Sequence, residues 1–116
     1  MEPKIQINRI KQVLKDPSFT EFLSKEGLYP LFSQNIEILQ MNITRKCNLT
    51  CRHCHVNAGP ESVKEMSKDV LLKCYETAAL PEIKTIDITG GAPEMHPQLP
   101  WFIKKITQFG KRIIIR

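Results

Sequence analysis

The sequence lacks any long apolar run. No stretch approaches the ~18 consecutive apolar residues that indicate a membrane-spanning helix. The first twenty residues include Glu2, Lys4 and Arg9, and they contain no apolar segment of the kind found in secretory signal peptides. We therefore expect a cytoplasmic protein with no membrane partner. In that compartment cysteines stay reduced, and clustered cysteines bind metals or act in catalysis more often than they form disulfides.

Aromatic residues are scarce as well. They make up only 7% of the chain, and the basic residues behind its net charge of +5 are dispersed rather than gathered in one patch. A nucleic-acid-binding surface usually combines a basic patch with aromatic side chains on which bases stack. We therefore expect no nucleic-acid partner. A nucleic-acid-binding fragment remains the weakest alternative, and its binding would fall steeply with salt.

Cysteines are few, but three of the four lie close together. Cys47, Cys51 and Cys54 form a C-x3-C-x2-C array. Three cysteines are an odd number, so they cannot all form disulfides with one another. Three thiolates on one loop can converge on a single inorganic centre. Four-iron clusters ordinarily take four cysteines, so three leave one iron open to a small molecule. The fourth, Cys74, is expected to be buried on the apolar side of a helix.

Two other interpretations of this array stay open. The array could belong to a small zinc or iron–sulfur module with a structural or electron-transfer role, in which His53, His55 or a distant residue is the fourth ligand. A zinc module should lose its metal to chelators and unfold. Alternatively, the three cysteines could be unligated loop residues. A zinc module would ignore the small molecules that an open iron binds, so the two classes can be separated by experiment.

Hydrophobic periodicity predicts two leading helices followed by a βαβαβ order. Strands separated by helix-length segments imply a parallel sheet with right-handed crossovers, so the fold class is α/β with about three parallel strands. A capping box at Ser18 starts the second helix, and Ser67 caps the third. The expected elements are helices at 4–15, 18–26, 68–79 and 100–109, strands at 38–43, 85–89 and 112–116, and a long loop at 45–66.

The third predicted strand coincides with the end of the sequence. We therefore expect residues 1–35 to be an N-terminal helical extension. Residues 36–116 are expected to be the N-terminal part of a larger α/β barrel or open sheet, truncated in its third strand. The loop at 45–66 is far longer than the ~2–6 residues usual between a strand and a helix, and long loops of this kind are usually functional.

Two motifs on successive strands carry a family resemblance. The array Cys47-x3-Cys51-x2-Cys54 follows the first strand, and the turn Gly90-Gly91-Ala92-Pro93-Glu94 follows the second. Together they resemble the cysteine signature and the glycine-rich turn of the radical S-adenosylmethionine (SAM) superfamily. The fuller wording, Leu39-Gln40-Met41-Asn42, Cys54-His55-Val56 and Asp87-x-Thr89-Gly90, is similar to the arsenosugar-biosynthesis (ArsS-like) branch.

The resemblance implies a partial radical SAM (β/α) barrel and a chemistry. Cys47, Cys51 and Cys54 would hold a [4Fe–4S] cluster that reductively cleaves SAM to methionine and a 5′-deoxyadenosyl radical. In the ArsS-like branch the small-molecule substrate is a methylated arsenical, and the electron would come from a donor such as a flavodoxin or ferredoxin. The resemblance therefore implies an enzyme. A fragment of this length is expected to bind the cofactors weakly and turn nothing over unless a partner chain completes the barrel.

The SAM contacts implied by the resemblance are His53, Gly90, Gly91, Ala92 and Pro93. His53 stands where the superfamily usually has an aromatic residue that contacts adenine, and a solvated loop histidine is the equal alternative. Glycines lack a Cβ, so Gly90-Gly91 lets the backbone pass close to a ligand; a plain turn is the alternative. We accordingly expect Gly91→Val to weaken SAM binding more than it lowers cluster content.

Three further polar residues near these motifs have no assigned role. Glu94 is offset by two positions from the glutamate usual in the turn, which Ala92 replaces here. Asp87 lies inside the second strand as a polar residue near the site. His55 follows the last cysteine of the array, where it could contact either a cluster or the loop itself.

Overall fold

A computed structural model describes residues 8, 10 and 17–116 of the chain. The predicted helix at 4–15 lies outside the described residues, apart from its two isolated positions. The chain divides into two compact units, residues 1–34 and 35–116, and each is considered by itself. Within the part that is described, no helix has the length and apolar character needed to cross a membrane.

The first unit contains helix α2 (Phe19–Lys25). Its start is the predicted capping box: the Glu21 amide donates to Ser18 Oγ at 3.3 Å, and the Ser18 amide donates to the Glu21 carboxylate at 2.7 Å. These bonds lower the pKa of Glu21, with the backbone bond from Ser18 as the largest cause. Gly27 has a φ of 70° just beyond the helix, a conformation that suits glycine and ends the helix.

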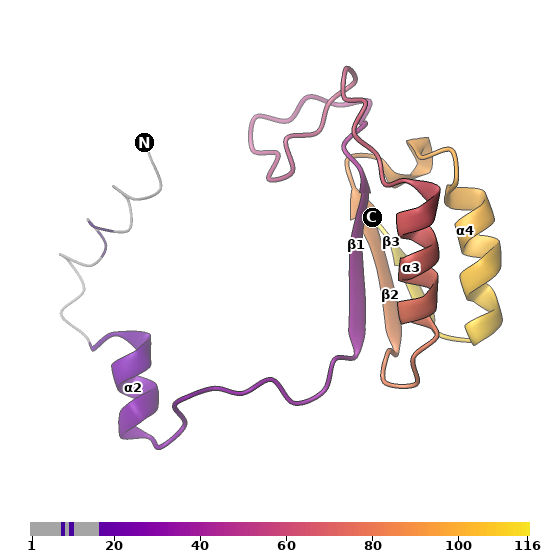
Figure 1. Ribbon diagram of the computed structural model, residues 1–116. Helices are drawn as coiled ribbons and strands as arrows, with labels where there is room; N and C mark the ends of the chain where they lie inside the picture. The colour runs from indigo at the N-terminus through magenta and orange to yellow at the C-terminus, as the bar shows by residue number, and fades with distance from the viewer. Residues whose placement is uncertain (1–7, 9, 11–16) are drawn as a thin grey trace. The chain divides into compact units, whose positions relative to one another are not determined.

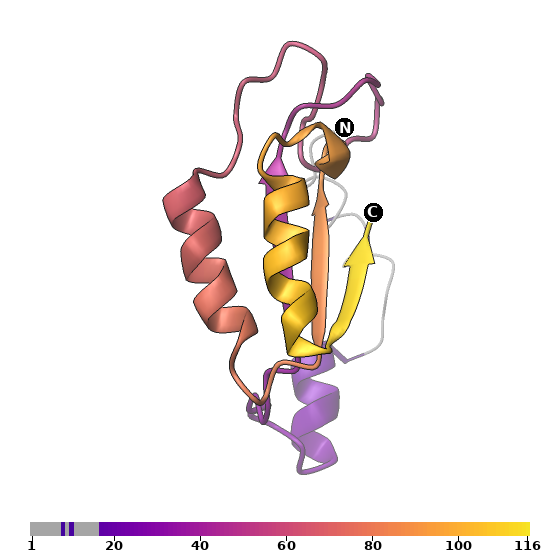
Figure 2. The same cartoon turned by 90° about the vertical axis from the view of Figure 1, so that its right-hand side faces the viewer.

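The second unit is a three-stranded parallel sheet with helices on one face (Figures 1 and 2). The strands lie in the order β1-β2-β3, which confirms the predicted α/β fold with three parallel strands. The sheet is open and consistent with part of a radical SAM barrel. Its elements are β1 (Ile38–Thr44), α3 (Lys68–Ala78), β2 (Thr85–Gly90), η1 (Pro93–Met95), α4 (Leu99–Ile106), η2 (Thr107–Phe109) and β3 (Arg112–Ile115).

The predicted boundaries differ from the observed ones by a residue or a turn. Helix α4 begins at Leu99, and the last turn predicted for it is the 3₁₀ helix η2, which ends where Gly110 has a φ of 61°. Ser67 Oγ accepts from the Val70 amide at 3.4 Å, as its capping role predicts. Such differences are expected because helix ends often tighten into 3₁₀ turns.

The alternation of side chains along the strands separates a core face from a polar face. Ile86 and Ile88 of β2 are fully buried beneath the helices. Leu71 of α3 and Phe102 of α4 are also fully buried and belong to the same core cluster. Asp87, between the two isoleucines, points to the opposite face because successive strand residues alternate sides. Both helices lie on the core face, and no helix or strand of this unit lies on the polar face (Figure 1).

Cys74 and Trp101 lie at the margin of this core. Cys74 is half-buried, with its Sγ 3.8 Å from Met66 Sδ, and burial raises the pKa of its thiol. Trp101 is also half-buried and packs against the core, with Lys68 Nζ 5.2 Å from its ring centroid. Both residues therefore contribute to packing, as the sequence predicts, although the cysteine is less enclosed than expected.

Candidate functional site

The loop after β1, residues 45–66, carries the three clustered cysteines and is here called the cysteine loop. Its entry is paired with its return. The Arg45 amide donates to the Lys64 carbonyl at 2.8 Å, the Gly59 amide to the Arg45 carbonyl at 3.0 Å, and the Cys47 amide to the Gly59 carbonyl at 3.2 Å. The segment between Cys47 and Gly59 is therefore closed at its base, and the cysteines lie within it.

Thr44, the last residue of β1, strengthens this base. It is 3% exposed, its hydroxyl accepts from the Lys46 amide at 3.0 Å, and it donates to the Lys64 carbonyl at 3.4 Å. The Met66 amide donates to the Ile43 carbonyl at 2.7 Å, which returns the chain to the strand before α3 begins. Thr44 thus connects the entry of the cysteine loop to its exit.

The turn after β2, residues 90–96, is here called the glycine turn, and it packs directly on the entry of the cysteine loop. The Gly91 amide donates to the Thr44 carbonyl and the Ala92 amide to the Lys46 carbonyl, both at 2.8 Å. A Cβ at Gly91 would lie 2.4 Å from the Lys46 carbonyl oxygen. At Gly90, whose φ is 146°, it would lie 2.4 Å from the Thr44 carbonyl oxygen. The close approach that requires both glycines is thus to the chain's own backbone.

This contact changes what the glycine turn can offer a ligand. We expected its exposed amides and carbonyls to be free for SAM, but the amides of Gly91 and Ala92 are used within the chain. No hydrogen bond among the described residues uses the carbonyl oxygen of Gly91. Ala92 and Pro93 are buried, and Glu94 is exposed with its side chain in no hydrogen bond of the described part. The turn therefore keeps an acceptor for a ligand rather than donors.

His96 ends the glycine turn and fixes the exit of the cysteine loop. It is 2% exposed, its Nε2 lies 2.9 Å from the Met66 carbonyl oxygen, and its Nδ1 accepts from the Gln98 amide at 3.1 Å. Because a carbonyl can only accept and an amide N–H can only donate, Nε2 is the donor nitrogen and Nδ1 the acceptor. The sequence analysis predicted neither the contact of His96 with Met66 nor that of Lys46 with Ala92. The first joins a side chain to a backbone carbonyl thirty residues away, and the second is made by backbone groups alone.

The three thiols differ in exposure and in electrostatic surroundings. All are reduced; Cys47 and Cys54 are half-buried, and Cys51 is exposed. Cys54 Sγ accepts from the Ala58 amide at 3.2 Å. That hydrogen bond is the largest cause that lowers the pKa of the Cys54 thiol, and a hydrogen bond from the Val56 amide is the next. Both favour the thiolate, the form that binds metals.

The donor set suits an iron–sulfur cluster in the kind of ligand it offers, three thiols on one loop. Among residues 8, 10 and 17–116, no three His, Cys, Asp or Glu side chains are gathered to hold a metal ion. The three thiols nevertheless all fall on the closed segment of the cysteine loop, and thiolates are the usual ligands of such clusters. Inside that segment the backbone bonds are local, from the Cys54 amide to the Cys51 carbonyl and from Asn57 to Cys54. The segment can therefore fold around a cluster while its base stays in place.

The two loop histidines occupy different settings. His53 is exposed and makes no hydrogen bond within the described residues. His55 lines a cavity of about 590 Å³ together with Arg45, Lys64, Ser67 and Asn42. Neither histidine joins the cysteines in a metal-binding group of the described chain, so this geometry does not distinguish a zinc site from a cluster site.

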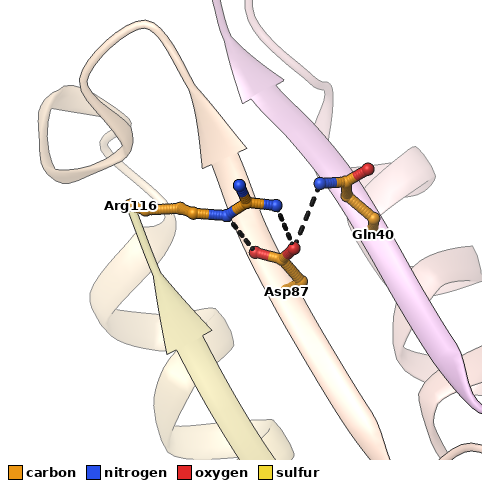
Figure 3. Close-up of polar contacts among 3 residues, drawn as sticks. All are labelled: Gln40, Asp87 and Arg116. Carbon is orange, nitrogen blue, oxygen red and sulfur yellow. Dashed lines mark hydrogen bonds and ion pairs between the residues drawn. The ribbon is translucent and has the colours of Figure 1, made fainter.

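Asp87 lies on the polar face of the sheet, within a small network (Figure 3). Gln40 Nε2 donates to its Oδ2 at 3.0 Å, Arg116 Nε donates to its Oδ1 at 3.0 Å, and Arg116 Nη2 donates to Oδ2. The hydrogen bond from Arg116 is the largest cause that lowers the pKa of Asp87. The carboxylate is therefore ionised and neutralised by Arg116, a partner that the sequence analysis did not identify.

The fold and the two motifs define a class, and comparison with known proteins gives its family. The model of the radical SAM superfamily matches residues 41–116, and the chain belongs to that superfamily. Members of this superfamily generally use a [4Fe–4S] cluster and SAM, and the expected membership of the superfamily is confirmed.

Named relatives resemble the chain over most of its length. A probable GTP 3',8-cyclase of Sulfolobus acidocaldarius is 28% identical over 80 residues, and one of Methanococcus maripaludis is 33% identical over 76 residues. These alignments cover 69% and 65% of this chain but 26% of each relative, so the chain spans about a quarter of their length. No solved structure matches it. Because these relatives are named for GTP cyclisation, the ArsS-like branch stays a prediction.

Proposed function

We propose that this chain supplies the cluster-binding and SAM-binding part of an enzyme that reductively cleaves SAM. One observation supports the proposal above all: the glycine turn is bonded to both the entry and the exit of the cysteine loop, through Lys46 and Met66. Both motifs therefore lie at the carboxyl end of the strands, where parallel α/β folds bind their ligands. Residues 36–116 are then the N-terminal part of a larger barrel.

In this proposal the chain's own residues bind and orient the cofactors. Cys47, Cys51 and Cys54 would hold the cluster, and Cys54 is already favoured as a thiolate by the amides around it. The Gly91 carbonyl would accept from the amino group of SAM, and exposed His53 would stack on adenine. A cluster held by these cysteines would supply the single electron needed for the reductive cleavage of SAM.

The remaining proposed SAM contacts are Gly90, Ala92 and Pro93. These residues would shape the glycine turn and donate no hydrogen bond to SAM. Gly90 and Gly91 lack a Cβ, which lets the backbone of Thr44 and Lys46 pack against the turn. Ala92 and Pro93 are buried and anchor the turn. The electron donor in this proposal is a small redox protein such as a flavodoxin or ferredoxin. Exposed Arg45, Lys46 and Arg52 on the cysteine loop would attract an acidic partner of that kind.

For the substrate we propose a methylated arsenical in arsenosugar biosynthesis, supported by the wording of the motifs at residues 39–42, 54–56 and 87–94. A second candidate is cyclisation of a guanine nucleotide, supported by the names of the relatives. The two are separated by incubating the longer protein that contains this chain with SAM, a reductant and either substrate. An adenosylated arsenical supports the first candidate, and a cyclised nucleotide supports the second.

The proposed cofactor chemistry is tested by electron paramagnetic resonance. The chain is reconstituted with iron and sulfide without oxygen, reduced, and measured with and without SAM. We expect a four-iron signal that changes when SAM is added, since SAM would bind the open iron. A four-iron signal indifferent to SAM would contradict the SAM site, and zinc in place of iron would contradict the cluster.

A further inference from the structure

The uncovered face of the sheet carries a row of hydrogen-bond donors at its carboxyl edge. Asn42 and Thr89 are partners in the β1–β2 register, and Arg116 follows Ile115, the partner of Ile88 in β2. The side chains of Asn42, Thr89 and Arg116 are therefore neighbours across three strands that lie ~4.8 Å apart. The residues that alternate with them in β1 and β2 are buried under α3 and α4, so these side chains lie on the opposite face. Asn42, on the edge strand, also lines the cavity that contains His55 and Lys64.

Arg116 in this row is held in one orientation by Asp87. Its Nε donates to Asp87 Oδ1 at 3.0 Å, its Nη2 donates to Oδ2, and Gln40 donates to the same carboxylate (Figure 3). The Asp87 side chain is 9% exposed, whereas that of Arg116 is 59% exposed. The carboxylate is thus buried and fully engaged, while much of the guanidinium stays open to the uncovered face.

The row offers donors that the described residues do not use. A guanidinium carries five N–H groups, and Asp87 takes one on Nε and one on Nη2. The remaining three have no partner among the described residues, and neither do the side chains of Asn42 and Thr89. Among the described residues, Asp87 is the carboxylate that forms an ion pair with Arg116, and each neutralises the other. A guanidinium fork flanked by an amide and a hydroxyl matches an oxyanion better than a neutral or cationic group.

We propose that Asn42, Thr89 and Arg116, here called the oxyanion row, bind an anionic oxygen-bearing group of the substrate. Asp87 acts as a positioning residue that holds Arg116 for this contact. That the bound group belongs to the substrate rests on the proposed function. Binding of an oxyanion to the row does not require a cluster. A methylated arsenical and a nucleotide phosphate both bring such a group to the face.

Orientation by Asp87 explains how an exposed arginine can bind with specificity. A free arginine side chain loses considerable conformational entropy when a ligand fixes it, and that loss weakens binding. Here the bidentate contact with Asp87 fixes the side chain before the ligand arrives. Asp87→Asn keeps the shape of the side chain but removes its charge, so it should release Arg116 without changing the other two members of the row.

The test is a nuclear magnetic resonance titration of the whole 116-residue chain. Arginine Nε–Hε signals are followed while inorganic phosphate or dimethylarsinate is added at constant ionic strength. We expect a saturable shift of the Arg116 signal. Arg116→Gln should abolish saturable binding, seen as the loss of shifts at the Asn42 side-chain amide. Asp87→Asn and Arg116→Lys should each weaken binding about tenfold, because the first releases Arg116 from its fixed orientation and the second removes the guanidinium fork.

Arg112→Gln is the matched control, because Arg112 lies on the same strand and face but four residues away, at the amino end. It should leave the affinity unchanged. Shifts that rise linearly, or that are equal at all arginines, would overturn the proposal, because they would show general charge screening. A shift of Arg116 with SAM but not with either oxyanion would also overturn it, since the row would then belong to the cofactor.

The same titration on the Cys51→Ser chain separates this inference from the proposed function. Saturable oxyanion binding there, in a chain that gives no SAM-sensitive cluster signal, would support the row by itself. Conversely, a SAM-sensitive cluster in a chain whose Arg116 does not respond to oxyanions would overturn the row and leave the cofactor site intact.

Discussion

The Ala92 amide donates to the Lys46 carbonyl at 2.8 Å, and a Cβ at the preceding residue, Gly91, would lie 2.4 Å from that same oxygen. The two motifs of the site are therefore in backbone contact, with no side chain between them. A substitution in the glycine turn must displace the entry of the cysteine loop before it affects any ligand.

Gly91→Ala should consequently lower cluster content and SAM binding together, because a methyl group cannot fit against the Lys46 carbonyl. Sequence reasoning alone predicts a selective loss of SAM binding for Gly91→Val, and the observed contact argues against that selectivity. Iron and sulfide content after reconstitution, with SAM binding measured by calorimetry, tests the difference. Gly59→Ala is the matched control: Gly59 is in the cysteine loop, and a Cβ there would meet nothing within 4 Å.

Cys51→Ser should remove most of the bound iron while leaving the helices folded. The Cys51 side chain is exposed, and the base of the loop is held by backbone bonds that do not involve this thiol. Elemental analysis and far-ultraviolet circular dichroism measure the two effects. Cys74→Ser is the control: Cys74 is a residue of α3 that lies beside Met66, outside the cysteine array, so this variant should keep the bound iron. Equal iron in Cys51→Ser and the unmodified chain would refute the assignment of Cys51 as a ligand.

The pH dependence of stability should reveal the contact between Asp87 and Arg116. Arg116 lowers the pKa of Asp87 in the folded chain below the unfolded value of about 3.9. The folded state then binds fewer protons, so the contact stabilises the fold above about pH 4 and is lost as the pH falls through the lowered value. Arg116 and Gln40 are the described residues bonded to this carboxylate.

Urea unfolding of Asp87→Asn between pH 7 and pH 3 measures this contribution. We expect the variant to be less stable than the unmodified chain at pH 7, with a difference that narrows below about pH 4. Glu61→Gln changes an exposed carboxylate in the cysteine loop and should show no such narrowing. A difference that is the same at every pH would show that Asp87 stabilises the fold by shape alone.

His96→Ala should destabilise the fold by about 1–3 kcal/mol, because it leaves the Met66 carbonyl and the Gln98 amide without their partners. It should also reduce cluster content, since Met66 is the exit of the cysteine loop. Thermal unfolding and iron content give the two measurements. His53→Ala is the comparison: His53 is exposed and unbonded in the described chain, so it should leave stability within about 0.5 kcal/mol.

Most of the fold could be predicted from the sequence because its signals are local. Alternation along 85–89 and the capping residues Ser18 and Ser67 each act within a few residues, and the elements they predict are present. The cysteines could likewise be singled out from their spacing. The functional branch could not be settled this way, because the residues that would select a substrate lie on a polar face with no periodic signature.

The contacts that assemble the site could not be predicted for a different reason. They join positions that are distant in the sequence: Lys46 with Ala92, Met66 with His96, and Asp87 with Arg116. The first is made by backbone groups that every residue possesses. The second depends on a histidine whose neighbours give no hint of its partner. The third requires the register of β2 and β3, which no turn type fixes when parallel strands are joined by a helix.

The closed base of the cysteine loop has a consequence for the order of assembly. The cost of bringing the ends of a loop together is entropic, and here backbone hydrogen bonds at Cys47 and Gly59, which use no thiol, offset part of that cost. Iron and sulfide would then need to order only the short segment above that base. The polypeptide should mature by folding first and receiving its inorganic centre afterwards, unlike a zinc finger, in which the metal is itself the condition for folding.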